Sequence, residues 1–290
     1  MQLDIFEHSR DVMLRNDVLQ ALQQRDAIAA RGAAQCLAQE FPNDGALADL
    51  QTLAAALEAP PGTAFAQHGD AASAIRGLRD DIEPACLRLF GSADGAAWCR
   101  PLWRRLAERA AALGFDPGHE HSHAAALWLL AGQAAAAADA VARIESWRRI
   151  PAPLAWMCEA RWQLDGLDVC WGLLAELAWL APARFDALVQ RLPDPLLQRL
   201  RRQFDQGFEG SGDISDLAWW PAWVLTDKPA LAPLLGQAQP GLNTPPERGM
   251  RALLDLLHLE RQGRQRELVE QRRRLRDLQP ALFSAYMATR

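Results

Sequence analysis

The sequence has 290 residues, of which 50% are hydrophobic and 23% are charged, and its formal net charge is -5. A chain of this length and composition can bury a continuous core and is expected to fold. The negative charge argues against non-specific nucleic-acid binding, and no apolar run approaches the ~20 residues needed to cross a bilayer. We therefore expect a soluble protein with no direct nucleic-acid partner and no membrane contact.

The first twelve residues carry acidic side chains early and lack a basic segment leading into an apolar core, so they do not resemble a secretory signal. The five cysteines are widely spaced, odd in number and without a CxxC pair. This is the pattern of neither a disulfide framework nor a zinc knuckle. We expect a cytoplasmic protein with reduced, mostly buried cysteines, and no cofactor.

The N-terminal region, 1–61, is predicted to be a helical unit. An apolar stripe at helical spacing runs through 9–24, and two further helices are predicted over 27–41 and 46–58. The region ends at Pro60-Pro61-Gly62, and the segment 62–69 that follows has the Pro, Gly and Thr content of a linker or surface loop.

The central region, 70–206, is predicted to be a series of helices. The first two span 70–90 and 94–113. Asp116-Pro117 is a start signal for the next helix, with Asp as N-cap and Pro at the first helical position. Two helical hairpins with similar sequences are then predicted over 119–182.

A glycine-rich break at 207–213 precedes the C-terminal region, 213–290. This region is predicted to open with a Trp-rich helix and to end in a helical hairpin that turns at Gly263. Between them, the Pro/Gly-rich segment 236–249 is the most loop-like part of the chain. The Arg-rich final hairpin also contains acidic residues at helical spacing, which predicts a solvated face with ion pairs.

The eleven tryptophans predict extensive aromatic packing, because large aromatic side chains dominate cores and interfaces. Most are expected in the core, whereas Trp219, Trp220 and Trp223, before a Pro-rich stretch, are expected to be partly exposed. No segment of five or more residues alternates apolar and polar side chains in the manner of a strand. The predicted fold class is therefore all-α.

Two pairs of residues repeat at one period. Trp128 and Trp162 lie 34 residues apart, and so do Gly132 and Gly166. This is the length of one helix-turn-helix repeat. Four predicted turns are each followed by a helix that ends near a proline. The turns are at Asp26, Gly132, Gly166 and Gly263, and the prolines are Pro42, Pro151, Pro182 and Pro280.

This pattern resembles the tetratricopeptide repeat, whose hairpin has an aromatic residue in its first helix and a small residue deep in its second. Trp128 and Trp162 match the aromatic position, and Ala38 and Ala178 match the small one. The resemblance is partial: at the small position other hairpins carry Ile144 and Leu275, and Glu159 replaces a small residue early in one first helix. It implies stacked helical hairpins, as an α-solenoid or an irregular array, the alternative being an irregular helical bundle.

The N-terminal segment Gln2-Leu3-Asp4-Ile5-Phe6 resembles the pentapeptide by which bacterial polymerases and repair proteins bind the DNA sliding clamp. In such a peptide, Leu3 and the Ile5-Phe6 pair insert into apolar pockets while Gln2 forms hydrogen bonds at the rim. The structural alternative is that the apolar side chains pack onto the first helix. The resemblance implies partner-binding residues Gln2, Leu3, Asp4, Ile5 and Phe6.

A second motif, HExxH, is formed by His119, Glu120 and His123. In zincins, two His one helical turn apart bind zinc and the Glu acts as general base. Here the motif lies at the start of a predicted helix instead of its middle, and Glu145 and Glu159 are candidates for a third ligand only by distance along the chain. A His-rich, solvated helix start is the competing interpretation.

These observations favour a non-enzymatic adaptor or scaffold. An all-α, repeat-like protein of this kind binds a protein partner on its helical surface, and the N-terminal peptide implies recruitment to the sliding clamp. The alternative is a zinc-dependent hydrolase that uses His119 and His123 as ligands and Glu120 as base.

Overall fold

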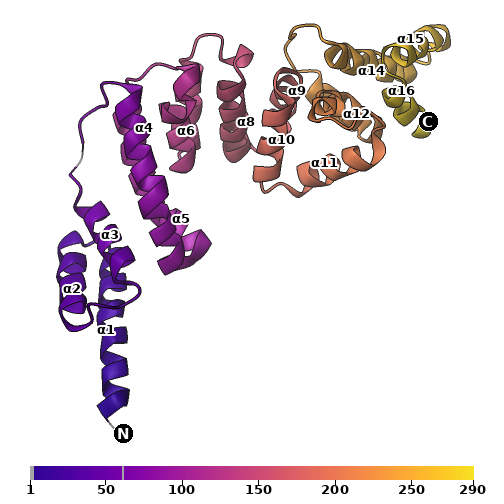
Figure 1. Cartoon of the computed structure of the whole chain (residues 1–290). Coiled ribbons are helices and arrows are strands. Elements are labelled where there is room, and N and C mark those ends of the chain that lie inside the picture. The colour runs from indigo at the N-terminus through magenta and orange to yellow at the C-terminus, as the bar shows by residue number, and fades with distance from the viewer. Residues whose placement is uncertain (1–2, 61) are drawn as a thin grey trace. The chain divides into compact units, whose positions relative to one another are not determined.

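The computed structural model describes the backbone of residues 3–60 and 62–290, and the side chains from Arg10 onward. Within these ranges the chain is helical and contains no β-strand, which confirms the predicted all-α class (Figure 1). The contacts between residues group the chain into two compact units, unit 1 over residues 1–133 and unit 2 over residues 134–290. This division differs from the three predicted regions, because its boundary follows the turn at Gly132.

Unit 1 begins with α1 (Leu3–Gln23), α2 (Ala27–Glu40) and α3 (Leu47–Glu58), which pack against one another (Figure 1). The turn between the first two helices lies where the sequence predicts it. Asp26 is the N-cap of α2, and its carboxylate accepts a hydrogen bond of 3.0 Å from the backbone N of Ala29, which satisfies one of the free N–H groups at the helix start.

The next helical stretch of unit 1 consists of α4 (His68–Gly77), the π-helix η1 (Leu78–Ile82) and α5 (Glu83–Ala110). Gly91 divides α5 into two helical parts, because its φ of 78° and ψ of 178° are not helical. This left-handed conformation favours glycine. The break lies in the gap between the two helices that the sequence predicts, so both predicted helices are present.

The chain folds back on itself at this break. A Cβ at Gly95 would lie only 2.8 Å from the carbonyl O of Cys86, so a side chain larger than hydrogen does not fit there. The thiols of Cys86 and Cys99 meet in the same corner, 3.3 Å apart. Cys36 is exposed and the other four cysteines are buried, which confirms that most of them are buried.

Unit 1 ends with the 3-10 helix η2 (Pro117–Ser122) and α6 (Ala124–Leu130). The predicted cap is present, because the Asp116 carboxylate accepts a hydrogen bond of 2.8 Å from the backbone N of Gly118. The turn after α6 has φ of 70° at Gly132. This left-handed conformation agrees with the predicted turn position.

Unit 2 opens with three α-helices and two short 3-10 helices: α7 (Ala134–Ala142), η3 (Trp147–Arg149), α8 (Pro151–Asp165), η4 (Asp168–Cys170) and α9 (Trp171–Leu180). Gly166, a predicted turn, follows α8 with φ of 82°. Several predicted helix-ending prolines are also the first residues of the following helix, where a missing N–H costs nothing. Pro151 begins α8 in this way, and Pro182 begins α10.

The middle of unit 2 is built from short helices around a tryptophan core: α10 (Pro182–Arg191), α11 (Pro195–Gly207), η5 (Ile214–Trp219), α12 (Trp220–Asp227), η6 (Pro229–Leu231) and α13 (Ala232–Leu235). The predicted partial exposure of Trp219, Trp220 and Trp223 is wrong, since all three are buried. Trp220 stacks on Trp171 with ring centroids 5.9 Å apart. The reason is that Trp219 and the residues 220–225 at the start of α12 are all apolar, and a helical segment that is apolar on every side is buried on every face.

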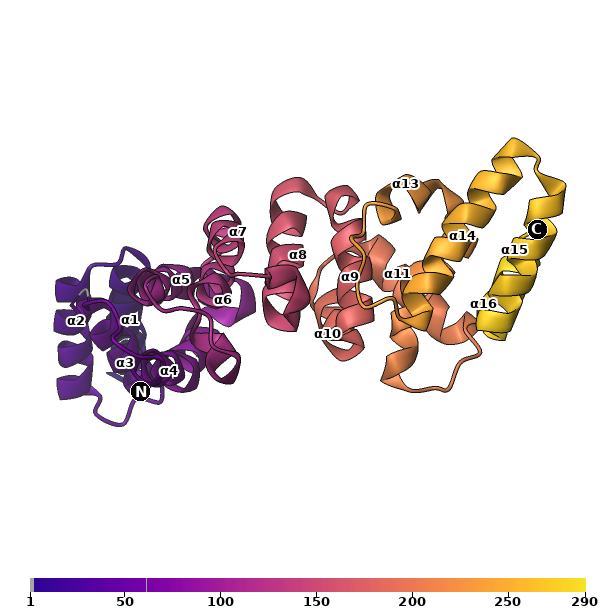
Figure 2. The ribbon, with the colours of Figure 1, turned by 90° about the horizontal axis from the view of Figure 1, so that it is seen from above.

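The C-terminal part of unit 2 consists of α14 (Pro245–Gln262), α15 (Gln265–Leu278) and α16 (Pro280–Ala288), which lie side by side in Figure 2. Gly263 forms the predicted turn, with φ of 68°. The predicted loop 236–249 ends earlier than expected, because Pro245 starts a helix.

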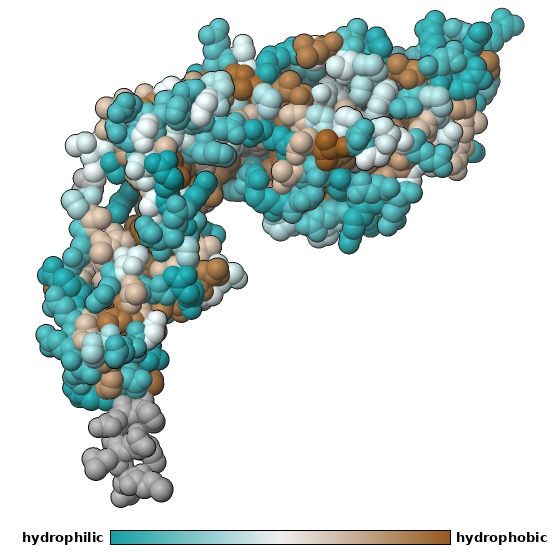
Figure 3. All heavy atoms as spheres, viewed as in Figure 1, coloured by the Kyte–Doolittle hydropathy of each residue, from teal (hydrophilic) through white to brown (hydrophobic). Residues whose placement is uncertain are grey.

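Hydrophilic residues cover much of the face shown in Figure 3, with hydrophobic residues scattered among them. On α15 the arginines pair with nearby acids, as the mixed charge pattern predicts. Arg274 lies 3.3 Å from Glu270, and Arg273 lies 3.9 Å from Asp277.

Among the described residues, every helix is too short or too polar to cross a bilayer.

Candidate functional site

The predicted clamp-binding peptide lies at the N-terminal limit of the residues that the structure describes. Gln2 lies outside the described residues, and so do the side chains of Leu3, Asp4, Ile5 and Phe6. The backbone from Leu3 onward belongs to α1. The role of these five residues as a partner-binding site therefore stays a prediction.

The HExxH segment does not form the α-helical turn on which the zinc-hydrolase alternative depends. His119 lies within the 3-10 helix η2 and has non-helical φ and ψ of -133° and 34°. His123 is extended and forms the N-cap of α6. Because one continuous α-helical turn is needed to place residues i and i+4 on one face, the expected pairing of the two imidazoles with Glu120 between them loses its geometric basis.

The two histidines instead make local structural contacts. His119 Nδ1 lies 2.9 Å from a carboxylate oxygen of Asp116. His123 is buried, and its Nδ1 accepts a hydrogen bond of 3.2 Å from the backbone N of Ala125. In the part of the chain that the structure describes, no group of three or more His, Cys, Asp or Glu side chains is arranged to hold a metal ion.

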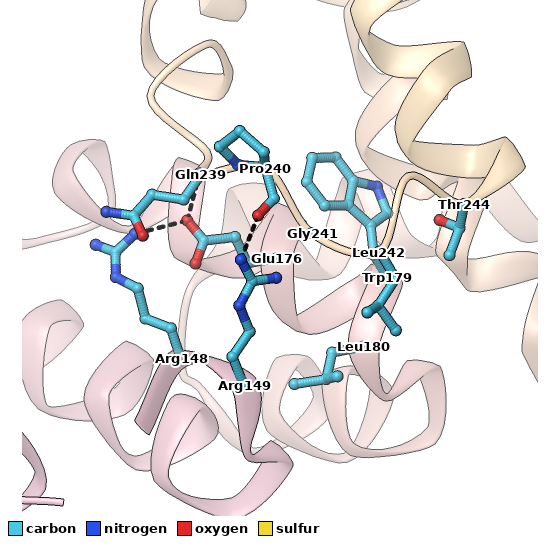
Figure 4. A pocket seen from close by; sticks show the side chains of 10 residues that line it. All are labelled: Arg148, Arg149, Glu176, Trp179, Leu180, Gln239, Pro240, Gly241, Leu242 and Thr244. Carbon is cyan, nitrogen blue, oxygen red and sulfur yellow. Dashed lines mark hydrogen bonds and ion pairs between the residues drawn. The ribbon is translucent and has the colours of Figure 1, made fainter. Parts of the chain in front are cut away.

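A different site lies within unit 2, where the segment 237–244 crosses α9. There the structure encloses a cavity of about 100 Å³ (Figure 4). Its walls come from η3, α9 and the loop. The lining residues are Arg148, Arg149, Glu176, Trp179, Leu180, Gln239, Pro240, Gly241, Leu242 and Thr244.

A glycine on α9 allows the loop to approach this closely. A Cβ at Gly172 would lie 3.0 Å from the backbone N of Ala238 and 3.2 Å from the carbonyl C of Gln237. Both are backbone atoms, which cannot move away as a flexible side chain does. The loop can therefore lie directly on the helix backbone at this point.

Glu176 holds the loop at one end of the cavity. One oxygen of its carboxylate accepts hydrogen bonds from the backbone N of Gln239, at 2.8 Å, and from Arg148 Nη1, at 2.9 Å. The Glu176 side chain is 8% exposed. Burial raises the pKa of Glu176, and the Gln239 N–H and the neighbouring guanidiniums act in the opposite direction.

Glu247, at the start of α14, holds the other end of the loop. It is buried, and its two carboxylate oxygens accept hydrogen bonds from the backbone N of Gly241 and of Asn243, each at 2.9 Å. Arg251 lies 3.4 Å from the same carboxylate. Two buried carboxylates thus receive the N–H groups of one short loop, which fixes its conformation.

Arg149 stands at the rim of the cavity. Its Nη2 donates a hydrogen bond of 2.7 Å to the carbonyl O of Pro240, as Figure 4 shows. The side chain is exposed. Arg148, by contrast, is engaged with Glu176, so the two neighbouring arginines have different environments.

The remaining wall is largely apolar, with Trp179 and Leu180 from α9 and Leu242 from the loop. Leu242 is 77% exposed. Within this wall, Trp179 Nε1 and Thr244 Oγ1 are buried and have no hydrogen-bond partner among the described residues. The site therefore combines an apolar surface, a cationic rim and two unsatisfied polar atoms.

The residues of this site do not stand out in the sequence by any motif. Trp179 is one of the tryptophans that are mostly expected in the core, and the segment 236–249 is predicted only as a loop. One local signal was available: Glu176 is the single charged residue in α9, whose sequence is WGLLAELAWL. A lone carboxylate in an otherwise apolar helix must find a partner when buried.

No protein-family model, curated protein or solved structure matches the chain.

Proposed function

We propose that the protein is a non-enzymatic helical adaptor that binds a partner protein, and that the cavity under the loop 237–244 receives one side chain of that partner. The observation that carries this proposal is the fixed loop over α9, held by Glu176 and Glu247. It provides a cavity whose shape exists before any partner binds, so little ordering cost remains to be met on binding.

The dimensions of the cavity favour a side chain over a substrate. Small-molecule sites usually enclose about 300–1,000 Å³, whereas this cavity measures about 100 Å³. An apolar cavity of about 150 Å³ holds a benzene ring. The space therefore suits an aliphatic side chain, and the exposed Leu242 beside it offers further apolar contact.

The helical hairpins also support the proposal that the protein binds a partner. The resemblance to tetratricopeptide repeats, carried by Trp128, Trp162 and the turn glycines, implies a protein whose helical surface meets other chains. Arrays of this kind bind along extended surfaces because each repeat contacts only its neighbours. The inference from repeat to partner binding is an analogy of fold, and the cavity is the specific feature that makes it testable.

Selection from a random peptide library displayed on phage tests the proposal, with the purified full chain as bait. We expect enriched peptides that share an aliphatic residue and that lose binding to the Leu242→Asp variant. The control is Val269→Asp, which changes an exposed aliphatic residue on α15, 68% exposed. Peptides that bind both variants as well as the wild type would contradict a role for the cavity.

The N-terminal peptide adds a separate proposal, recruitment to the bacterial DNA sliding clamp through Gln2 to Phe6. It rests on the sequence resemblance. Binding of the full chain to immobilised, purified clamp is the measurement, and the double change of Leu3 and Phe6 to Ala is expected to abolish it. The control changes Val12 and Met13, two exposed apolar residues further along α1, to Ala. Equal retention of the native and doubly changed chains overturns this recruitment.

A further inference from the structure

Arg149 has hydrogen-bonding capacity that its own chain does not use. A guanidinium carries five N–H donors, and among the described residues the Arg149 side chain donates one hydrogen bond, from Nη2 to the Pro240 carbonyl. Pro240 lines the cavity beside it, so this bond orients the guanidinium at the rim (Figure 4). The remaining donors are available to a group that enters from outside.

The charge of Arg149 is also unbalanced. Arg148 pairs with Glu176, and Arg251 pairs with Glu247. Arg149 pairs with no carboxylate in the described part of the chain. Both carboxylates near the loop accept hydrogen bonds from backbone N–H groups and pair with another arginine, so Arg149 interacts with Glu176 only through longer-range attraction. The rim therefore presents one positive charge, and an anionic group complements it.

The inner wall complements an aliphatic group. Trp179, Leu180 and Leu242 supply apolar surface, and the size of the cavity accommodates a branched alkyl group but not a large aromatic one. Two buried polar atoms on this wall, Trp179 Nε1 and Thr244 Oγ1, lack partners. An alkyl group offers these two atoms no hydrogen bond, so ordered water or a polar group of the occupant must supply it.

We propose that the cavity binds an aliphatic carboxylate: a branched alkyl group contacts Trp179, Leu180 and Leu242, and the carboxylate accepts hydrogen bonds from Arg149. This rests on the proposed function and specifies the partner chemistry. In a partner protein, the group is a Leu or Val side chain beside an acidic side chain or a C-terminal carboxylate. Free aliphatic acids share the same chemistry and serve as the probe.

The test follows the indole N–H signal of Trp179 by NMR while the full-length protein is titrated with 4-methylpentanoate. The signal is identified by its loss in Trp179→Phe. The neutral probe is 4-methylpentanamide, which keeps the alkyl group without the charge. We expect both probes to shift the signal, and the acid to bind about fivefold more tightly, as one exposed charge pair allows.

Variants at Arg149 test whether this residue causes the preference for the acid over the amide. Arg149→Gln is expected to reduce the binding of the acid to that of the amide, and Arg149→Lys to restore part of the difference. The control is Arg273→Gln on α15, whose side chain is 70% exposed, and which is expected to leave both probes unaffected. A circular dichroism melt of each variant shows that the fold is retained.

The outcomes separate this inference from the proposed function. Equal binding of acid and amide overturns the carboxylate preference and leaves the cavity as an apolar side-chain site. An acid preference that survives in Arg149→Gln overturns the role of Arg149. If neither probe shifts the Trp179 signal, both the inference and the use of this cavity in partner binding are overturned. Tighter binding of a free acid than of a peptide that ends in Leu assigns the site to a small molecule and overturns the protein partner.

Discussion

Two loops that look alike in the sequence are held in opposite ways. In unit 1, arginines of α5 donate to the backbone carbonyls that follow α3: Arg105 Nη1 to Ala59 O at 3.2 Å, and Arg109 Nε to Thr63 O at 2.8 Å. In unit 2, the N–H groups of the loop 237–244 are accepted by the carboxylates of Glu176 and Glu247.

The difference is one of burial more than of charge. The arginines of unit 1 lie partly in solvent, beside an open groove of about 710 Å³, so water can replace their contacts. The two glutamates of unit 2 are buried, and their loss leaves backbone N–H groups without a partner. Breaking a contact with a buried acceptor is more costly than breaking one that water can replace. We expect the loop of unit 2 to be much less tolerant of change than the loop of unit 1.

Removal of the Glu247 carboxylate is expected to have the largest effect. Glu247→Ala leaves the N–H groups of Gly241 and Asn243 without an acceptor and Arg251 without a partner. The expected loss is about 2–4 kcal/mol of the free energy of unfolding, measured by urea denaturation. Glu267→Ala, at an exposed ion pair of α15, is the control and is expected to cost less than about 1 kcal/mol. Similar losses for the two variants would contradict a special role for the buried carboxylate.

The next largest effect is expected from Gly172→Ala. The added methyl group meets the backbone at Ala238, so the loop must move or α9 must bend, at about 1–3 kcal/mol. Gly32→Ala is the matched control, because this exposed glycine within α2 has nothing within 4 Å of the new Cβ. It is expected to stabilise the protein by about 0.5–1 kcal/mol. Thermal melts of both variants test whether the two changes have opposite signs.

The helices could be predicted from local signals. Pro151, Pro182 and Pro280 mark the ends of predicted helices and also begin the helices that follow, and glycine marks turns at Gly166 and Gly263. Each such signal acts within a few residues, so it needs no knowledge of the fold. The prediction from the tryptophan cluster near the start of α12 is wrong, because the apolar sequence around these tryptophans is stronger evidence for burial than their clustering is for exposure.

The site could not be predicted, because its contacts join distant parts of the chain. Glu176 and Gln239 are 63 residues apart in sequence, and Arg149 and Pro240 are 91 apart. Composition shows that 237–244 is a loop but not which helix it crosses. At His119 and His123, the alternative of a zinc site requires a shared helical face, and the local backbone does not provide one.

A smaller effect is expected in unit 1. Arg109→Ala removes the hydrogen bond to Thr63 and the stacking of the guanidinium over Phe65, 3.9 Å from the ring centroid. Because the guanidinium is partly solvated, the expected loss is about 1 kcal/mol. Arg109→Lys keeps the charge without the planar fork and is expected to recover only part of it. Urea denaturation of both variants is the measurement, and a loss as large as that of Glu247→Ala would remove the contrast between the two loops.

The smallest effect is a dependence of stability on pH through Glu176. Burial raises the pKa of this carboxyl, and the Gln239 N–H and then Arg148, Arg149 and Arg251 partly offset it. The folded state therefore holds the proton more tightly than the unfolded state, whose Glu pKa is about 4.3. Stability is then highest below that value, falls as the pH rises through the raised pKa, and is constant above it.

Glu176→Gln removes this titration while keeping an acceptor for the Gln239 N–H. The measurement is the difference in free energy of unfolding between wild type and variant across the acidic range, in which titrations common to both proteins cancel. The wild type is expected to lose stability relative to Glu176→Gln as the pH rises. A difference that changes in the opposite direction would show that Arg148 and the loop stabilise the charged form more than burial opposes it, and the buried carboxylate of unit 2 would then resemble the solvated ion pairs of unit 1.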